Sequence, residues 1–545
     1  MDKTLKFVII LFLLIAAIKI ILTFFVTSPT IFADEYFYSK MAQSYFNFRE
    51  FSIHSELTKA YPPLYSVLIS PAYIFKNMMT IYSVIKIINA VISSLIIFPA
   101  YFFAKEFLSS KKALLSSILI SVLPANLAFS SYVMSENLFY LLFLISLYFI
   151  YKSFKEDNLM FDAFAGIFIG LTILTRYLGF ALLIPVLALV IYHLLIGKKI
   201  LPKLLLLGIV GLIISAWLFR NGYLFGFTID GLLGTYIRDG YPVTFTPLSM
   251  FIWTIINFGI VIASTGFIFT LSILSNIKQS FSKNKILYVI LFSVMLAVLV
   301  MLAERTAGSA LFKVDTLLAL TGRPSARYFD VLAPLVIIGG LVSMNQQKVS
   351  RNVIIFLGIV MLFTSQLIFF QLFPVNNMSL LWLGAISYTT KALTSNLFSL
   401  TAIALIALMS GVAISKFLLE RFKPNKLVVI LIIAFLVLSA VNVAVISINS
   451  TNWRNSNGSQ IGLWADENLS GIFLIDEKYC NEFDFRQQGT LCSKNNKVSL
   501  IGFWIKDEIR IGDPNEIPVN YIITRDILTL EKIYELDGTF IYKSA

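Results

Sequence analysis

Long apolar runs recur along the first 447 residues of the chain, and short polar segments separate them. A helix of roughly 17–25 apolar residues crosses the ~30 Å hydrocarbon core of a bilayer, so the pattern predicts a polytopic α-helical membrane protein with about thirteen transmembrane helices. We place these helices near residues 7–26, 81–104, 113–130, 136–151, 160–175, 177–196, 201–219, 250–275, 286–303, 328–345, 352–373, 392–417 and 427–447.

One apolar segment does not fit this series. YPPLYSVLISPAYIF, residues 61–75, is short and contains three prolines. Counting it as a span would put the lysines of residues 105–112 on the wrong side of the membrane. Proline is well tolerated in the first turn of a helix, so we predict an interfacial or re-entrant helix here.

The basic residues define the orientation of the chain. Alternate loops read KEFLSSKK, YKSFKED, GKKILPK, NIKQSFSKNK, QQKVSR and KFLLERFKPNK. Lys and Arg concentrate in cytoplasmic loops, so we expect a cytoplasmic N-terminus in the plasma membrane of the cell. The extracytoplasmic face then receives residues 27–79, 219–249, 304–327 and 374–391, and also the C-terminal tail.

The tail, residues 448–545, has a different character. It is polar and contains the short apolar runs GIFLI, KVSLIGFWI, VNYIIT and TFIYK. This pattern predicts a small extracytoplasmic α/β domain of roughly a hundred residues. The chain would thus consist of a membrane domain, 1–447, with a first outer loop, 27–79, that carries amphipathic helices, and a soluble domain, 448–545. The tail also holds both cysteines, Cys480 and Cys492, and an oxidising exterior favours a disulfide between them.

Composition agrees with a membrane protein and removes several other classes. The chain is 58% hydrophobic and 13% charged, whereas soluble domains carry about 25% charged residues. The net charge of +13 follows from the basic cytoplasmic loops, so we predict no nucleic-acid partner. No Walker A, G-x-G-x-x-G or H-E-x-x-H pattern points to nucleotide or zinc-protease chemistry.

Ionisable residues gather on the predicted outer face. Arginine presents a fork suited to phosphate and a carboxylate can act as a general base, so the set suggests an outward-facing cavity that handles a phosphorylated lipid. Snorkelling at the interface is the alternative for each residue taken singly, as is a helix start for the acidic pair 34–35. The set comprises Asp34, Glu35, His54, Glu56, Lys59, Glu136, Arg176, Arg220, Asp230, Arg238, Asp239, Glu304, Arg305, Lys313, Asp315, Arg323 and Arg327.

Several motifs occur in a characteristic order: DE after the first span, then YPPLYSV, SENLFYLLF, TRYLGFALLIP, WLFRN and RYFDVLAP. In this order the chain resembles the GT-C superfamily of integral-membrane glycosyltransferases, in particular the protein O-mannosyltransferases and the aminoarabinose transferases of lipid A. The resemblance covers most of residues 1–345. It implies transfer of a hexose or pentose from a dolichyl or undecaprenyl phosphate to an extracytoplasmic protein, lipid or lipid-linked glycan, with inversion at the anomeric carbon.

The resemblance also implies roles for individual residues. The first-loop acid of these families corresponds to Asp34, with Glu35 beside it, as catalytic base. Tyr61 stands where the families often carry a charged residue, which puts the role of Lys59 in doubt. Glu136 is a cavity candidate, although a carboxylate that compensates the helix dipole beside a capping Ser135 is the alternative. The implied phosphate-binding residues are Lys59, Arg176, Arg220 and Arg327, and Tyr61, Asn221 and Tyr328 are further cavity candidates.

No cofactor is implied as obligatory, and a divalent metal ion remains an option. Asp34, His54 and Glu56 are weak candidate ligands because they share the first outer loop but lack a tight ligand spacing. Two other functions stay open. A polymerase or ligase of lipid-linked glycans would belong to the same broad class. A transporter or flippase would place charges at mid-membrane and show two similar halves, whereas here the charges gather at the outer ends.

Overall fold

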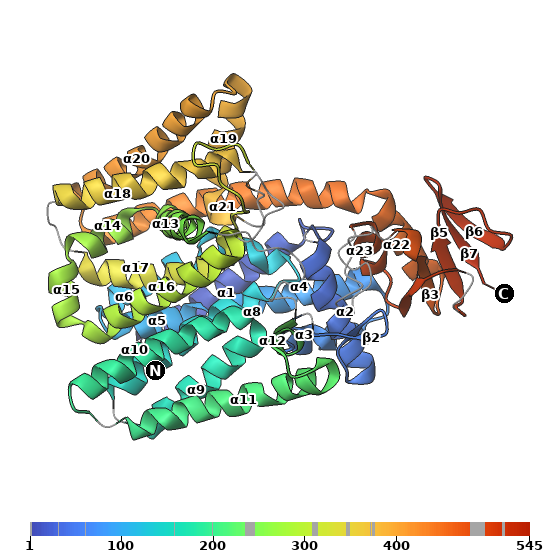
Figure 1. Ribbon diagram of the computed structural model, residues 1–545, viewed down its shortest axis with the longest axis horizontal. Helices are drawn as coiled ribbons and strands as arrows, with labels where there is room; N and C mark the ends of the chain where they lie inside the picture. Colours follow the sequence, from blue (N-terminus) through green and yellow to red (C-terminus); the bar gives the residue numbers. More distant parts are fainter. Residues whose placement is uncertain are drawn as a thin grey trace.

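The computed structural model describes residues 3–30, 32–59, 61–156, 158–198, 200–234, 246–307, 314–344, 349–370, 372, 377–479, 496–514 and 518–544. Long apolar helices run side by side through most of the molecule, and a small mixed domain lies at one end of them (Figure 1). The two cysteines of the predicted disulfide, Cys480 and Cys492, lie outside the described residues, as do Arg238, Asp239 and Lys313.

Eleven helices of the described chain are long and apolar enough to cross a membrane, and a helix pair bent by 57° makes a twelfth if it counts as one span. The chain is therefore an integral membrane protein, and the predicted fold class is confirmed. The eleven are α1 (Lys3–Thr23), α4 with α5 (Met78–Ser94, Ile97–Lys105), α8 (Glu136–Lys155), η3 with α10 (Tyr177–Leu182, Leu183–Leu195), α11 (Leu201–Phe225), α13 (Pro247–Ser264), α16 (Lys285–Ala307), η5, η6 and α17 (Ala326–Tyr328, Asp330–Leu332, Ala333–Ser343), α18 with η7 (Arg351–Thr364, Ser365–Phe369), α20 (Leu397–Arg421) and α21 (Pro424–Arg454).

Each of the predicted spans corresponds to helical structure, with three departures. The predicted span 160–175 is α9 (Leu159–Thr175), which at 17 residues is shorter than the others. The bent pair is α6 (Ser110–Ser121) followed by α7 and η2 (Pro124–Ala128, Phe129–Ser131), and it bends where Pro124 cannot continue the hydrogen-bond ladder. The predicted span 250–275 breaks at Gly266, whose φ of 80° ends α13 before α14 (Ile268–Ser275).

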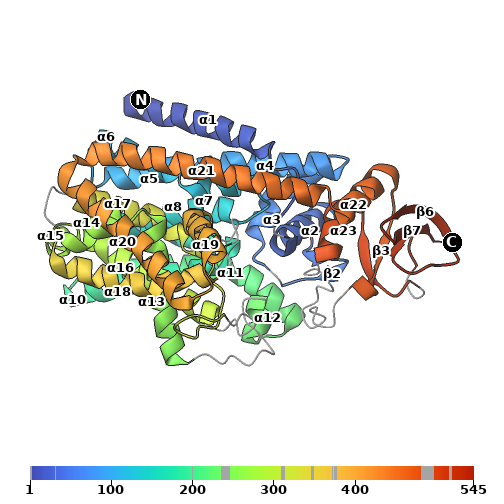
Figure 2. The same cartoon turned by 90° about the horizontal axis from the view of Figure 1, so that it is seen from above.

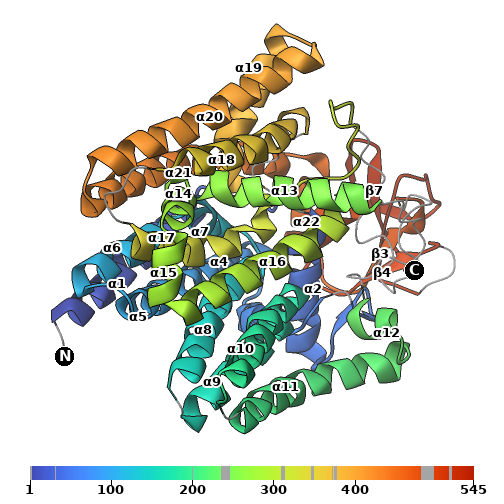
Figure 3. The same cartoon turned by 60° about the vertical axis from the view of Figure 1, so that its left-hand side comes forward.

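The helices form two flanks around a central layer. On one flank α9 packs against both α8 and α11, and on the other α18 packs against α20 (Figure 1 and Figure 3). The Pro-Pro segment forms a short helix, as predicted, made of α3 (Leu64–Ile69) and η1 (Ser70–Ile74). The remaining short helices are α12 (Ile229–Leu233), α15 (Ile277–Lys283), η9 (Met378–Leu380) and α19 (Leu381–Leu393).

The C-terminal domain is the predicted α/β unit. α21 runs along the membrane domain and leads into α22 (Asn457–Asn468) (Figure 2). The sheet has the order β4-β3-β5-β7-β6, in which β3 is parallel to β4 and β5, and β7 is antiparallel to β5 and β6. Apolar residues of α22 and α23 pack on one face of this sheet. The elements are β3 (Phe473–Asp476), η10 (Glu477–Tyr479), α23 (Asn496–Phe503), β4 (Ile509–Gly512), β5 (Tyr521–Thr524), β6 (Glu531–Leu536) and β7 (Thr539–Lys543).

The first outer loop folds into α2 (Phe32–Phe48) and the hairpin β1–β2 (Ser52–Ile53, Glu56–Leu57). Buried aromatic side chains hold α2 between the membrane helices and the C-terminal domain. The Tyr36 hydroxyl lies 2.5 Å from where a Cβ of Gly502 would stand, so glycine permits this close approach to α23. α2 is thus fixed by both parts of the protein.

Three contacts fix the turn between α1 and α2, and with it the start of α2. Lys86 Nζ donates to the carbonyls of Thr23 and Val26 at 2.8 and 2.6 Å and so satisfies backbone groups left over at the end of α1. The Ser450 hydroxyl of α21 accepts the N–H groups of residues 27 and 28. Glu35 accepts the N–H of Thr30 at 2.9 Å and that of Val133 at 3.0 Å. These contacts give the first turn of α2, which carries the acidic pair, a defined position.

Candidate active site

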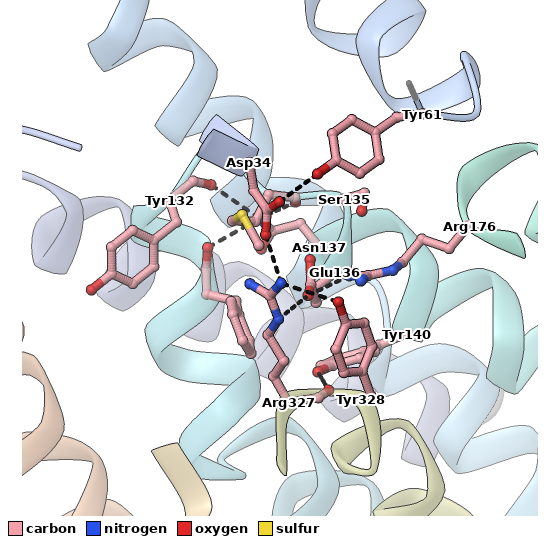
Figure 4. A network of polar contacts seen from close by, with 12 residues as sticks. Asp34, Tyr61, Tyr132, Ser135, Glu136, Asn137, Tyr140, Arg176, Arg327 and Tyr328 are labelled. Carbon is pink, nitrogen blue, oxygen red and sulfur yellow. Dashed lines mark hydrogen bonds and ion pairs between the residues drawn. The ribbon is translucent and has the colours of Figure 1, made fainter. Parts of the chain in front are cut away.

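Asp34 stands in the first turn of α2, so the helix start that sequence analysis gave as the alternative for the acidic pair is present. Its two carboxylate oxygens have different partners (Figure 4). Tyr61 donates its hydroxyl to Oδ1 at 2.6 Å, and Arg327 Nη2 donates to Oδ2 at 2.6 Å. The side chain remains 17% exposed, so it is partly open to solvent while its orientation is fixed. Asp34 is therefore a positioned carboxylate that an incoming ligand can reach.

Glu136 extends this network into the membrane domain. It is 1% exposed, forms an ion pair with Arg176, and lies 3.8 Å from Arg327 Nε. The alternative in which Ser135 caps α8 is wrong: Ser135 makes no side-chain cap hydrogen bond, and its hydroxyl bonds to Tyr38 instead at 2.7 Å. Removing one partner of a buried ion pair leaves a desolvated charge, at a cost of about 3–5 kcal/mol. The pair with Arg176 is what allows Glu136 to be buried.

The pKa of Asp34 reflects these neighbours. Burial on its own would raise the pKa, but the charge of Arg327, the hydrogen bond from Tyr61 and the charge of Arg176 outweigh burial and lower the pKa to about 2. Asp34 is consequently an anion at physiological pH. A carboxylate with so low a pKa is a weak base for as long as these contacts persist.

Three arginines surround one aromatic ring at this site, and a fourth lies close by. Arg176, Arg305 and Arg327 place their guanidinium carbons 4.8, 5.3 and 5.0 Å from the ring centre of Tyr328. Arg323 is close enough to Arg327, Tyr328 and Asp34 for their charges to act on it. Opposite these cations stand Asp34 and Glu136, with Asp330 buried beyond Glu136. The site therefore brings several arginines together with three carboxyl groups.

Three further candidates form a neighbouring group. Lys59 pairs with Asp230 at 2.6 Å. Arg220 donates to the backbone carbonyls of Thr58 and Phe51 at 3.0 and 3.2 Å, and to Asn221 Oδ1 at 2.9 Å. Asn221 in turn donates to the carbonyl of Leu232. These contacts join α11 and α12 to the first outer loop, whereas the polar contacts of Asp34 go to Tyr61 and Arg327.

Glu35 and the suggested metal ligands do not converge with Asp34. The Glu35 carboxylate accepts backbone N–H groups and is fully buried. His54 lies at the tip of the β1–β2 hairpin, where its Nε2 atom is 2.7 Å from the hydroxyl of Tyr36. Over the described ranges, no cluster of three or more His, Cys, Asp or Glu side chains could hold a metal ion. His54 and Glu56 thus have no common centre with Asp34 in this part of the chain.

Sequence analysis placed Arg305 and Arg323 on the outer face without assigning either a role. Both are exposed, so ligand can reach them. The signal was available in RPSARY, where two arginines four residues apart lie at the start of a span, and in Arg305, which lies in the last turn of α16. Asp330 lies in the motif RYFDVLAP. Sequence analysis did not identify it as a buried neighbour of Glu136, because only the fold brings η6 and α8 together.

Replacing Tyr61 with phenylalanine removes the hydroxyl that donates to Asp34 and keeps the aromatic ring. Because that bond lowers the pKa of Asp34, we expect the pKa to rise from about 2 and the loss of activity on acidification to begin at a higher pH. The pH–rate profile between roughly pH 2 and 6 covers the range in which Asp34 titrates and so measures this shift. Tyr73→Phe is the matched control, since Tyr73 bonds to Ser39. Superimposable profiles of wild type and Tyr61→Phe would contradict the assigned contact.

Comparisons with known proteins bear on the fold of the chain. The sequence model of a family described as dolichyl-phosphate-mannose-protein mannosyltransferase matches residues 61–219. No curated protein sequence matches the chain. The fold is similar to the crystal structure of ArnT from Cupriavidus metallidurans in the apo state, with a TM-score of 0.57 and 12% identity over 98% of this chain and 97% of that chain.

The structure of the same ArnT bound to undecaprenyl phosphate gives a TM-score of 0.56 and 13% identity over 92% of this chain and 85% of that chain. The apo oligosaccharyltransferase of Archaeoglobus fulgidus is more distant, with a TM-score of 0.42 and 13% identity over 93% of this chain and 65% of that chain. The family match and the likeness of fold to ArnT together confirm the predicted resemblance to the GT-C superfamily.

Proposed function

We propose that this chain is a glycosyltransferase that moves a sugar from a polyprenyl phosphate donor to an acceptor hydroxyl. The observation that carries the proposal is the cluster of arginines around Tyr328 and Asp34. A donor phosphate is an anion that such a cluster of cations suits, because arginine binds phosphate through paired hydrogen bonds. The GT-C fold and the undecaprenyl phosphate bound to the similar ArnT support this donor class.

The transfer step is a displacement at the anomeric carbon. The acceptor oxygen forms a bond to the anomeric carbon while the bond between that carbon and the donor phosphate oxygen breaks. Attack from the side opposite the leaving group inverts the configuration. The acceptor proton goes to Asp34, and the polyprenyl phosphate leaves as an anion held by Arg176 and Arg327. An acceptor hydroxyl has a very high pKa, so a carboxylate positioned to take its proton lowers the barrier. The leaving phosphate needs no proton from an acid.

Donor binding also explains how Asp34 can act as a base although its pKa is low in the absence of donor. Arg327 is the cation that most strongly lowers this pKa, and it is one of the arginines that face the phosphate. When Arg327 binds the phosphate, its interaction with Asp34 weakens and Asp34 becomes a stronger base. The carboxylate is thus most basic when the donor is present, which limits wasteful proton transfer in the empty site.

The neighbouring group has a supporting role in this scheme. Lys59 is already paired with Asp230 and Arg220 with backbone carbonyls, so these residues hold the wall of the donor site. The acceptor is a protein, a lipid or a lipid-linked glycan. The membrane catalytic domain comprises residues 1–447, and residues 448–545 form a soluble domain that faces the acceptor.

Replacing the two exposed arginines, Arg305 and Arg323, tests whether the donor is a polyprenyl phosphate. We expect the double variant Arg305→Gln/Arg323→Gln to fold normally and to bind dolichyl and undecaprenyl phosphate at least about tenfold more weakly, since a hydrogen bond to a charged group contributes about 1.5–3 kcal/mol. Binding of radiolabelled polyprenyl phosphate to the purified protein measures this, and unphosphorylated polyprenol should not compete. A matched control is Lys391→Gln, whose Nζ donates to the Phe369 carbonyl. Unchanged phosphate binding by the double variant would remove the proposal.

The proposed orientation puts the site and the soluble domain outside a cell's plasma membrane. A cysteine at Ile527, which is 87% exposed in the soluble domain, is expected to react with a membrane-impermeant maleimide in intact cells. Cysteine at Lys198, in a basic loop, should react only after permeabilisation. Both are introduced after Cys480→Ser and Cys492→Ser. The reverse pattern of labelling would overturn the orientation.

A further inference from the structure

A cavity of about 440 Å³ lies between the second half of α2, the β1–β2 hairpin and residues 506–509 of the C-terminal domain. We call it the outer cavity. Its α2 residues, Lys40, Gln43, Ser44, Asn47 and Phe48, recur at spacings of three and four and share one face of the helix. At 100° per residue, Asp34 lies about 120° around the helix from Lys40 and about 9 Å along it. The outer cavity is therefore separate from the cluster around Asp34.

The lining of the outer cavity is polar and nearly balanced in charge. Eleven of its fourteen lining residues are polar, whereas most small-molecule pockets are lined mainly by apolar groups. Three carboxylates, of Glu50, Asp507 and Glu508, face two lysines. Lys40 is one of them, and its Nζ already donates to the Ile505 carbonyl at 2.6 Å and to Gln43 at 3.0 Å. Such a lining does not suit a phosphate and suits an uncharged ligand rich in hydroxyl groups.

The hairpin wall of the outer cavity is held in an unusual conformation. His54 and Ser55 at its tip have φ of 53° and 64°, a region that residues other than glycine rarely adopt. The Ser55 hydroxyl donates to Glu508 Oε1 at 2.8 Å, and Tyr36 bonds to His54 at 2.7 Å. His54 and Ser55 are the two loop residues of the hairpin, and a favoured two-residue hairpin turn has positive φ at both positions. The wall is thus built jointly by the first outer loop and the C-terminal domain.

We infer that the outer cavity binds a saccharide portion of the acceptor, away from the hydroxyl that reacts. Sugar hydroxyls can donate to the carboxylates and can pair with the amide of Asn47, which both donates and accepts. Phe48, 64% exposed beside it, offers an apolar face to a sugar ring. A peptide would instead use apolar side-chain pockets or a strand edge, and Phe48 is the one exposed large apolar residue of the described lining. The inference rests on the proposed function, because it specifies the acceptor class.

Binding of neutral disaccharides to the purified full-length protein tests this inference. The probes are cellobiose, maltose, mannobiose and N,N′-diacetylchitobiose, with a serine- and threonine-containing hexapeptide as the competing class, and calorimetry measures affinity. We expect at least one disaccharide to bind saturably, and Asn47→Ala and Phe48→Ala each to weaken it at least tenfold. Both positions are exposed, so both variants should fold. Ile527→Ala, an exposed apolar residue elsewhere in the C-terminal domain, is the matched control and should bind as wild type does.

Three results would overturn the inference: no saturable binding of any disaccharide, equal binding by wild type and both cavity variants, or saturable binding of the peptide alone. The experiment does not depend on catalysis, because the Asp34→Asn variant should bind the same disaccharide with the same affinity. If the wild-type protein binds the disaccharide but does not transfer sugar from a polyprenyl phosphate, the result contradicts the proposed function and not the inference about the outer cavity. If the wild-type protein transfers sugar but binds no disaccharide, the result contradicts the inference about the outer cavity and not the proposed function.

Discussion

Asp34→Asn should lose sugar transfer while it continues to bind the donor. Asparagine has nearly the same shape and can still accept the Tyr61 hydroxyl, but it cannot take the proton of the acceptor. A positioned general base contributes typically about 10²–10⁴-fold to a rate, so we expect kcat to fall by that factor. Transfer from a radiolabelled polyprenyl phosphate sugar in detergent measures kcat, and binding of polyprenyl phosphate measures the retained site.

Glu35→Gln is the matched control for this prediction. Glu35 is adjacent and also carries a carboxyl group, but its carboxylate accepts the backbone N–H groups of Thr30 and Val133. We expect this variant to be less stable and, for each folded molecule, to transfer sugar at close to the wild-type rate. If Glu35→Gln lost transfer and Asp34→Asn kept it, the base would be Glu35.

The second large effect is expected for Arg327→Gln, which should lower both stability and donor affinity. Arg327 is 9% exposed and stands between Asp34, at 2.6 Å, and Glu136, at 3.8 Å. Removing it leaves two carboxylates facing each other with Arg176 as their nearest remaining partner. Breaking a buried charge pair in this way costs about 3–5 kcal/mol of stability. Thermal unfolding in detergent and the KM for the donor measure the two effects.

A double variant separates charge from packing. In Arg327→Gln/Asp34→Asn the unpaired carboxylate is removed together with its partner, so we expect part of the lost stability to return. Donor affinity should stay low, because the phosphate contact is still missing. Arg323→Gln, at an exposed position, should weaken the donor site without lowering the unfolding temperature. Additive losses in the double variant would show that Arg327 and Asp34 do not interact.

The helices were largely predictable and their interruptions were not. Runs of apolar residues locate the spans because a bilayer demands that length. The break between α13 and α14 depends on the positive φ of Gly266 and Phe267, and nothing in the apolar run INFGIVIASTGFIFTLSIL marks that break apart from a glycine that helices also tolerate. The bend before α7 was equally hidden inside an apolar stretch, although Pro124 marks it in retrospect.

The candidate site was predictable as a set of residues but not as a set of pairs. Charge patterning put Asp34, Glu136, Arg176 and Arg327 on one face, yet they come from α2, α8, the end of α9 and η5. Which arginine contacts which acid depends on how these elements pack, and sequence spacing says nothing about it. Lys59 illustrates the limit, because its partner Asp230 belongs to α12 and takes up the charge that a donor phosphate would need.

One measurement tests the central claim most directly. Purified wild-type protein and Asp34→Asn are each incubated with radiolabelled dolichyl or undecaprenyl phosphate sugars and with membrane extract as the source of acceptor. The account predicts that wild type forms labelled product and free polyprenyl phosphate in equal amounts, and that Asp34→Asn forms neither while it still binds polyprenyl phosphate. Equal product formation by a folded Asp34→Asn variant would contradict the account.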